Sequence, residues 1–130
     1  MSEPRPGAQC PFCSLLKERI WLETDAAVAV LDGFPVSDGH SLAIPKRHVE
    51  LLFDLPEGEL MEVWALVGKV RRLLQQKYKP DGFNIGVNEG QAAGQTIGHA
   101  HVHIIPRQTG DVADPRGGIR WVIPTRARYW

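Results

Sequence analysis

The most regular hydrophobic pattern in the chain lies near its middle and indicates a helix. Apolar residues recur there at steps of three and four, which places them on one stripe of an α-helix: Leu60, Val63, Val67, Val70 and Leu74. Pro56 suits the first turn of such a helix and Lys79 its last turn, and Pro80 does not continue it. The pattern predicts one long helix over residues 56–79.

Short apolar stretches on either side of this helix predict strands. They cover residues 20–23, 26–31 and 40–44 before the helix, and 83–88 and 100–105 after it. Turn-forming residues fill the loops at 32–39 and 89–94, and residues 14–19 are expected to form a short helix. We find no internal repeat, and this order of elements with short links favours an α+β domain with an antiparallel sheet.

Length and composition set limits on the class of protein. The chain has 130 residues, which fits a single domain over residues 10–130 after a flexible, proline-rich arm over residues 1–9. Fifteen basic residues balance fifteen acidic ones, which gives no support for a general nucleic-acid or membrane-surface binder. No apolar run approaches the ~20 residues that span a bilayer, and no secretory signal is visible. We therefore expect a cytoplasmic protein.

The C-terminal tail over residues 107–130 differs from the rest of the chain. It holds five arginines against two aspartates, a formal charge of +3, and three large aromatic residues, Trp121, Tyr129 and Trp130. We expect the tail to pack its aromatic side chains on the domain. The alternative is that it borders a site for an anionic ligand.

Three of the five histidines stand at alternate positions, His99, His101 and His103. On a strand such side chains share one face, while the intervening Ala100 and Val102 point into the core. A polar sheet surface or a metal site would also account for them, but His99 and His103 would lie ~13 Å apart on a strand, too far to serve one ion easily. Because imidazole titrates near pH ~6.5, one ring can be a neutral nucleophile beside another that donates a proton.

The loop before these histidines carries groups suited to phosphate oxygens. Gly90 and Gly94 offer backbone amides, Gln95 a side-chain amide and Thr96 a hydroxyl. No Gly-Lys-Ser/Thr follows, so the loop is not a P-loop. Its place before the histidines favours chemistry on a phosphate.

Residues 94–106, GQTIGHAHVHIIP, resemble the signature of the histidine triad (HIT) superfamily, in which three alternating histidines precede two apolar residues. Residues 38–48, DGHSLAIPKRH, and 87–90, VNEG, are also similar to segments of that family, so the resemblance covers roughly residues 10–108. Some of these segments are closest in sequence to the fragile-histidine-triad branch of dinucleoside polyphosphate hydrolases. Others are closest to the Hint branch of nucleoside phosphoramidases. The resemblance implies an α+β fold with an antiparallel sheet of about five strands, one long helix and one short helix.

The resemblance also implies roles for the histidines. His101 would attack the α-phosphorus of a nucleotide, forming a covalent nucleotidyl-histidine that water then hydrolyses. His103 would donate to a phosphate oxygen and to the leaving group, and His99 would hold the strand and the orientation of His101. His40 would support the triad through a hydrogen bond.

Substrate contacts follow from the same resemblance. Gln95 and Thr96 would bind the phosphate, Asn88 would line the pocket, and Asp32 would bind the ribose hydroxyls. Phe12 and Leu15 would flank the base. Purely structural roles remain open for several of these residues, with Asn88, Thr96 and Asp32 as turn residues and Phe12 as a core residue.

Cys10 and Cys13 have the spacing of half a tetrahedral zinc site. The resemblance implies that His48 and His99 complete a structural zinc site. A redox pair or two buried thiols are the alternatives.

The resemblance thus implies an enzyme that needs no catalytic cofactor, binds a purine nucleotide and forms a homodimer. A dinucleoside polyphosphate hydrolase is the first hypothesis. A purine nucleoside phosphoramidase, with a nitrogen leaving group, is the second, and a nucleotide-binding regulatory module without turnover is the third. A nucleotidyltransferase is disfavoured, because related uridylyltransferases have glutamine where His103 stands, and a metal-dependent hydrolase would be sensitive to a chelator.

Overall fold

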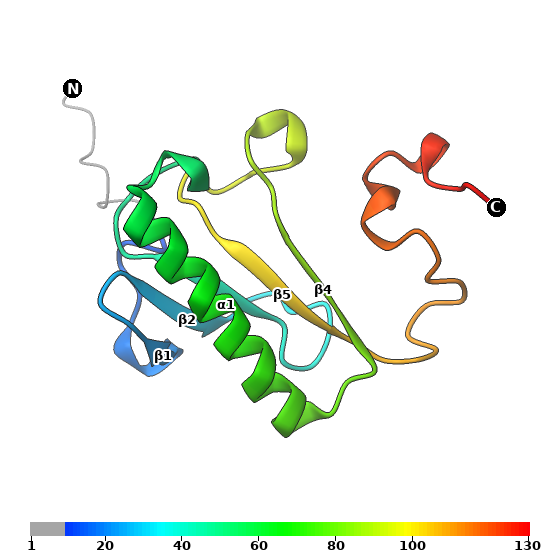
Figure 1. Ribbon diagram of the computed structural model, residues 1–130, viewed down its shortest axis with the longest axis horizontal. Helices are drawn as coiled ribbons and strands as arrows, with labels where there is room; N and C mark the ends of the chain where they lie inside the picture. Colours follow the sequence, from blue (N-terminus) through cyan, green and yellow to red (C-terminus); the bar gives the residue numbers. More distant parts are fainter. Residues whose placement is uncertain (1–9) are drawn as a thin grey trace.

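A computed structural model describes residues 10–130 of the chain as an α+β fold. Its sheet has five strands in the order β1-β2-β3-β5-β4, and every neighbouring pair is antiparallel. The strands are β1 (Ile20–Glu23), β2 (Ala27–Leu31), β3 (Ser41–Pro45), β4 (Gly82–Val87) and β5 (Val102–Arg107). The single α-helix in the described residues, α1 (Glu57–Tyr78), crosses one face of the sheet (Figure 1). The fold class predicted from the sequence is confirmed.

The hydrophobic core lies between α1 and the sheet. The helix buries four of the five residues of its predicted stripe, together with Leu66, whereas Leu60 is partly buried. They pack against small and branched residues of the strands: Ala27, Ala29, Ala43, Val102 and Ile104. Pro56 caps the start of the helix, and Lys79 ends it in the left-handed conformation at φ 49°. The observed bounds are therefore within one residue of the predicted ones at each end.

The remaining helical segments are 3-10 helices. The expected short helix over residues 14–19 is a 3-10 helix of three residues, because Leu16 and Ile20 on either side have extended backbones. The 3-10 helices are η1 (Lys17–Arg19), η2 (Leu52–Asp54), η3 (Gln91–Ala93), η4 (Gly118–Val122) and η5 (Pro124–Arg126).

The face of the sheet opposite α1 carries a second apolar cluster and the histidines. Val28, Val30, Leu42 and Ile44 form this cluster, and Phe12, Leu15 and Ile20 pack against it. Leu42 pairs with His103 in the β3–β5 register, so both side chains lie on this face. The sheet thus separates the helix-side core from the opposite face, which we call the histidine face.

The ends of four strands differ slightly from the prediction, and the differences in β3, β4 and β5 place the site residues. Strand β5 begins at Val102 rather than Ala100, so His99 and His101 precede it. Strand β3 begins at Ser41, which leaves His40 just before it, and β4 ends at Val87, just before Asn88.

The turn before His40 requires glycine at Gly39. Its φ is 87°, and a Cβ there would lie 2.8 Å from the Tyr78 ring of α1. The loop between β2 and β3 is therefore fixed against the helix at the point where the chain enters the site.

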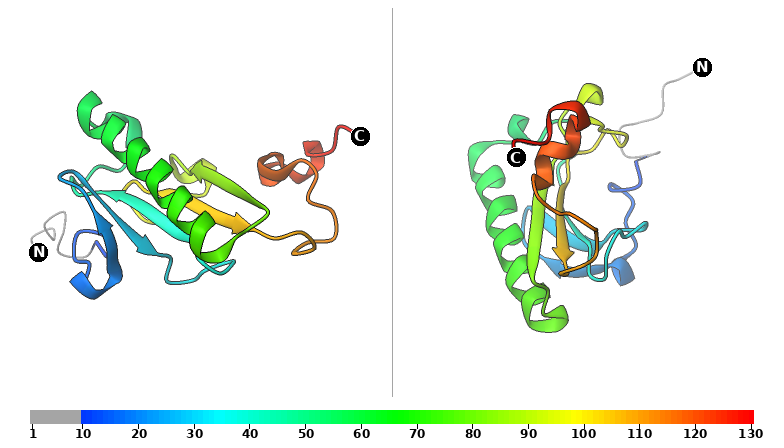
Figure 2. Two further views of the ribbon diagram at one scale, coloured as in Figure 1. Left: turned by 60° about the horizontal axis from the view of Figure 1, so that its bottom comes forward. Right: turned by 90° about the vertical axis from the view of Figure 1, so that its right-hand side faces the viewer.

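The tail beyond β5 lies along the edge strand β4 (Figure 2). Gly118 approaches Asn84, and Ile119 approaches Gly86, which pairs with His103. The tail therefore meets β4 on the histidine face, while its arginines stack on its own aromatic rings, as Arg116 does over Trp130 at 4.5 Å. The predicted arm over residues 1–9 lies outside the described residues. Within them, no helix combines the length and hydrophobicity needed to cross a membrane.

Candidate active site

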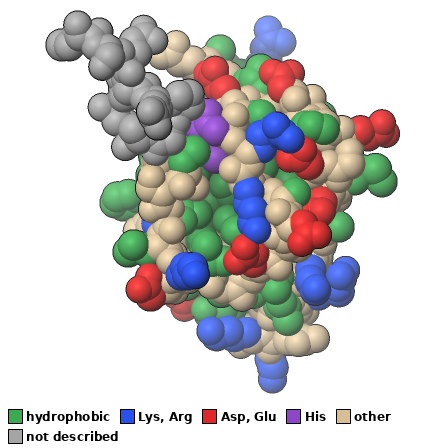
Figure 3. All heavy atoms as spheres, turned by 90° about the vertical axis from the view of Figure 1, so that its left-hand side faces the viewer, with side chains coloured by type: hydrophobic (Ala, Val, Ile, Leu, Met, Phe, Trp, Pro, Cys, Tyr) green, Lys and Arg blue, Asp and Glu red, His purple; other side chains and the backbone are tan. Residues whose placement is uncertain are grey.

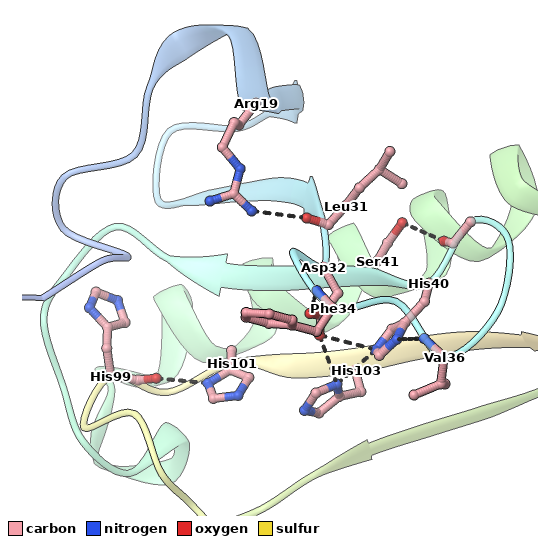
Figure 4. Close-up of polar contacts among 11 residues, drawn as sticks. Arg19, Leu31, Asp32, Phe34, Val36, His40, Ser41, His99, His101 and His103 are labelled. Atoms are coloured by element: carbon pink, nitrogen blue, oxygen red, sulfur yellow. Dashed lines mark hydrogen bonds and ion pairs between the residues drawn. The ribbon is translucent and has the colours of Figure 1, made fainter.

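Four side chains from two segments, the loop between β2 and β3 and the beginning of β5, meet on the histidine face. His40 Nε2 lies 3.0 Å from His103 Nδ1, and the two rings of His101 and His103 are 5.1 Å apart. Asp32, which directly follows β2, places Oδ2 3.4 Å from His40 Nε2 and 3.8 Å from His103 Nδ1. Figure 4 shows these residues converging from the loop after β2, from β5 and from the residue directly before β5. The structure therefore brings the predicted His40, Asp32, His101 and His103 together.

The protonation of His101 follows from its hydrogen bond to the backbone. Its Nδ1 lies 2.9 Å from the carbonyl oxygen of His99. Because a carbonyl oxygen only accepts, Nδ1 carries the proton, and in the neutral ring Nε2 presents a lone pair. His101 is thus arranged as a nucleophile.

The protonation of His103 follows from a chain of two hydrogen bonds. The backbone N–H of Val36 donates to His40 Nδ1 at 3.1 Å, so the neutral His40 ring carries its proton on Nε2. That proton points to His103 Nδ1, which must accept it, and His103 therefore carries its own proton on Nε2. Neighbouring rings thus present opposite functions, a lone pair on His101 and an N–H on His103.

The surroundings of His40 and His103 favour the neutral rings that these two hydrogen bonds require. Burial lowers the pKa of His40, and the Asp32 carboxylate opposes the shift. Burial also lowers the pKa of His103, the charges of His101 and His40 add to the effect, and Asp32 again opposes it. Both imidazoles are therefore held neutral near pH 7.

Phe12, which with Leu15 was predicted to flank the base, lies beside two of the histidines. The Phe12 ring is 5.1 Å from the His101 ring and 5.9 Å from the His99 ring, in edge-on contact with both. Leu15 packs on the same apolar cluster. The predicted turn role of Asp32 is also present, because its Oδ1 accepts the backbone N–H of Phe34 at 2.8 Å while Oδ2 faces the histidines.

Gln95 and Thr96, predicted to bind the phosphate, and Asn88, predicted to line the pocket, differ in their exposure and hydrogen bonds. Gln95 uses its side-chain amide to hold its own loop: Oε1 accepts the N–H of Gly90 at 2.8 Å, and Nε2 donates to the carbonyls of Glu50 and Ile97. A phosphate contact from this amide would require those bonds to open. Thr96 and Asn88 are exposed, one shortly before the histidines and the other directly after β4.

The second predicted cluster, Cys10, Cys13, His48 and His99, has its four ligand atoms within 4.8 Å of one another. His99 Nδ1 lies 3.3 Å from Cys10 Sγ, 3.5 Å from Cys13 Sγ and 3.2 Å from His48 Nδ1. His99 Nε2 donates to the carbonyl of Pro45 at 2.8 Å, which leaves the Nδ1 lone pair facing the cluster. Tetrahedral zinc bound to two sulfurs and two nitrogens separates its ligand atoms by about 3.3–3.8 Å, so these residues fit zinc.

A third cluster, Asp32, His40 and His103, also has metal-ligand spacing. In it, however, His40 Nδ1 accepts an N–H, whereas a metal-bound histidine ordinarily donates from its second nitrogen. The hydrogen-bonded arrangement therefore suits proton transfer better than metal binding.

A cavity of about 790 Å³ lies elsewhere, between β1 and the C-terminal half of α1. It is lined mainly by apolar side chains such as Trp21, Leu73 and Tyr78, and Asp32 borders it. On the side of the molecule seen in Figure 3, hydrophobic side chains are interspersed with charges of both signs. Because the triad histidines do not line this cavity, we place the reactive site on the histidine face instead.

Comparison with known proteins agrees with this geometry. Residues 15–110 match a family model described as HIT domain. An uncharacterized HIT-like protein of Mycoplasma genitalium is 38% identical over 113 residues, which are 83% of this chain and 80% of that protein. An asymmetrical bis(5'-nucleosyl)-tetraphosphatase of Schizosaccharomyces pombe is 36% identical over 74% of this chain and 53% of that protein. The crystal structure of a Zn-bound histidine triad family protein from Mycobacterium smegmatis superposes with a TM-score of 0.75 at 32% identity, covering 83% of this chain and 81% of that one.

Proposed function

Because the chain belongs to the HIT domain family, we propose that it hydrolyses a dinucleoside polyphosphate, such as diadenosine tri- or tetraphosphate, at the α-phosphate. The observation that carries this proposal is the opposite protonation of two adjacent rings. His101 offers a lone pair on Nε2, and His103 offers a proton on Nε2. A displacement at phosphorus needs both a nucleophile and a donor for the leaving oxygen.

In the first step, His101 Nε2 forms a bond to the α-phosphorus as the bond to the bridging oxygen breaks. His103 donates a hydrogen bond from its Nε2–H to the departing oxygen, which leaves as a phosphate anion, and the positive charge that develops on His101 is stabilised by the His99 carbonyl. In the second step, water attacks the same phosphorus, the P–N bond breaks, and a nucleoside monophosphate leaves. The proton that the attacking water loses passes to solvent, and both histidines return to the neutral forms in which they began.

A purine nucleoside phosphoramidase is the second candidate, because the same pair serves a nitrogen leaving group. His103 would then donate a hydrogen bond to the departing nitrogen, which needs a donor in order to leave even more than an oxygen does. The S. pombe relative, named as a tetraphosphatase, supports the anhydride substrate. A regulatory nucleotide-binding module would bind nucleotides without turnover.

A substrate panel tests the proposal. We would compare kcat/KM for diadenosine tri- and tetraphosphate with kcat/KM for adenosine phosphoramidates, each with and without a chelator. Preferred cleavage of the dinucleotides that survives the chelator supports the proposal. Preference for phosphoramidates favours the second candidate, and binding without cleavage favours the third.

We also propose a structural zinc held by Cys10, Cys13, His48 and His99. Zinc there would bind the N-terminal loop to the segment that precedes β5. For the homodimer, we propose contact through β4, whose only strand partner in the described sheet is β5, together with α1 and the tail.

A further inference from the structure

Phe34 is an apolar side chain that the fold leaves in solvent. It lies in the loop between β2 and β3 and is 91% exposed, more than any other large hydrophobic side chain in residues 10–130. Burying a phenyl ring stabilises a folded protein by roughly 1.5–3 kcal/mol, and an exposed ring does not contribute this free energy to folding. Burial against a bound ligand would contribute it to binding instead.

The backbone around Phe34 forms hydrogen bonds with two residues of the candidate site, Asp32 and His40. The N–H of Phe34 donates to Asp32 Oδ1 at 2.8 Å, and two residues later the N–H of Val36 donates to His40 Nδ1 at 3.1 Å. The N–H of Asp32 donates in turn to the His40 carbonyl at 2.9 Å, closing the base of the loop. The loop is thus tied to the site at both ends, and the ring is presented from a preorganised backbone.

The ring extends from beside Asp32 in the direction of His101 (Figure 4). In the function proposed above, on which this inference rests, Asp32 binds the ribose and His101 binds the α-phosphorus. Because the base is attached to the ribose, a nucleotide whose ribose is held at Asp32 brings its base close to the Phe34 ring, two residues along the chain. Phe12 flanks the His101 ring at 5.1 Å from the N-terminal loop.

We propose that Phe34 is a specificity-determining residue whose ring stacks on the nucleobase of the bound nucleotide. An aromatic face accepts any base, but a purine offers the larger stacking area, so the ring selects adenine or guanine over a pyrimidine or no base. Because stacking is the same in the ground state and the transition state, Phe34 acts on KM and leaves kcat unchanged.

The test compares Phe34→Ala with Phe34→Tyr and with Phe53→Ala, a matched control. Phe53 lies in η2 and is 60% exposed. Calorimetry measures the Kd of AMP and of ribose 5-phosphate, which lacks the base, and kinetics measure KM and kcat for the dinucleotide. We expect Phe34→Ala to weaken AMP about ten-fold, equivalent to about 1.4 kcal/mol. Ribose 5-phosphate and kcat should stay within about two-fold of wild type. Tyrosine should restore AMP binding, and Phe53→Ala should change nothing.

Unchanged AMP binding in Phe34→Ala, or an equal loss for ribose 5-phosphate, would overturn the inference. A molar mass of Phe34→Ala that differs from wild type by light scattering would also overturn it. Phe34 would then be an interface residue between copies of the chain. The proposed function fails separately, when the wild-type protein binds AMP but cleaves no nucleotide. The calorimetric comparison with ribose 5-phosphate still decides the role of Phe34 in that case.

Discussion

His101 donates the proton on its Nδ1 to the backbone carbonyl of His99 across 2.9 Å. The same His99 is buried, bonded through Nε2 to the Pro45 carbonyl, and directed through Nδ1 at the two cysteines. The carbonyl that sets the tautomer of His101 therefore belongs to a residue that is held from two sides. Orientation of the nucleophile thus depends on the cysteine–histidine cluster as well as on the triad.

Replacing the nucleophile should abolish turnover while leaving binding in place. In His101→Ala no nitrogen remains to form the covalent intermediate, and we expect kcat to fall by more than about 1,000-fold. AMP should still bind, because Phe12, Asp32 and His103 remain. Single-turnover kinetics and calorimetry measure the two properties. Turnover close to wild type would refute attack by His101.

Replacing the proton donor should make the rate depend on the leaving group. For His103→Asn we expect kcat to fall by about 100-fold or more with an alkoxide or amine leaving group, and much less with an acidic phenol, which departs unprotonated. His101→Ala serves as the control, because it should lose both activities equally. A His103→Asn loss that is the same for every leaving group would contradict the donor role.

Zinc should be present in the protein purified without chelator, at one ion per chain. His48→Ala removes one of the four proposed ligands and should lower both the zinc content and Tm, the latter by about 5 °C or more. His40→Gln is the matched control, since it removes a ligand of the other cluster and should retain the zinc. Metal analysis beside thermal unfolding distinguishes the two. Zinc lost from His40→Gln and kept in His48→Ala would place the metal at Asp32, His40 and His103 instead.

Local periodicity was sufficient to predict the helix and the number of strands. The stripe of α1 repeats within a few residues, and so its bounds agree within one residue of those predicted. The start of β5 depends on its neighbours instead. Residues of β3 and β4 begin to pair with β5 at Val102. The alternation of apolar and polar residues within β5 does not indicate where this pairing begins.

The site residues were found by their type and by the family resemblance, but several of their hydrogen-bond partners were not. Gln95 resembles a phosphate ligand until its bond to the Glu50 carbonyl, 45 residues away, is seen. The Val36 N–H that fixes the tautomer of His40 is a backbone group, which any residue type supplies. Phe34 lies among turn-forming residues, and its exposure and direction depend on how that loop folds.

Acid should destabilise the fold through His40. Its pKa is lowered in the folded protein by burial, beside Asp32 and His103, whereas the unfolded chain has the ordinary value near 6.5. Below pH ~6.5 the unfolded chain therefore binds a proton that the folded protein excludes, and the free energy of unfolding falls until the folded His40 is itself protonated. Above pH ~6.5 the contribution of neutral His40 to the free energy of unfolding is fully present. We expect Tm to fall between pH 7.5 and 5.5, and to fall less in His40→Gln, which keeps every other titrating group. Equal pH dependence in the two proteins would show that His40 is not held neutral by the fold.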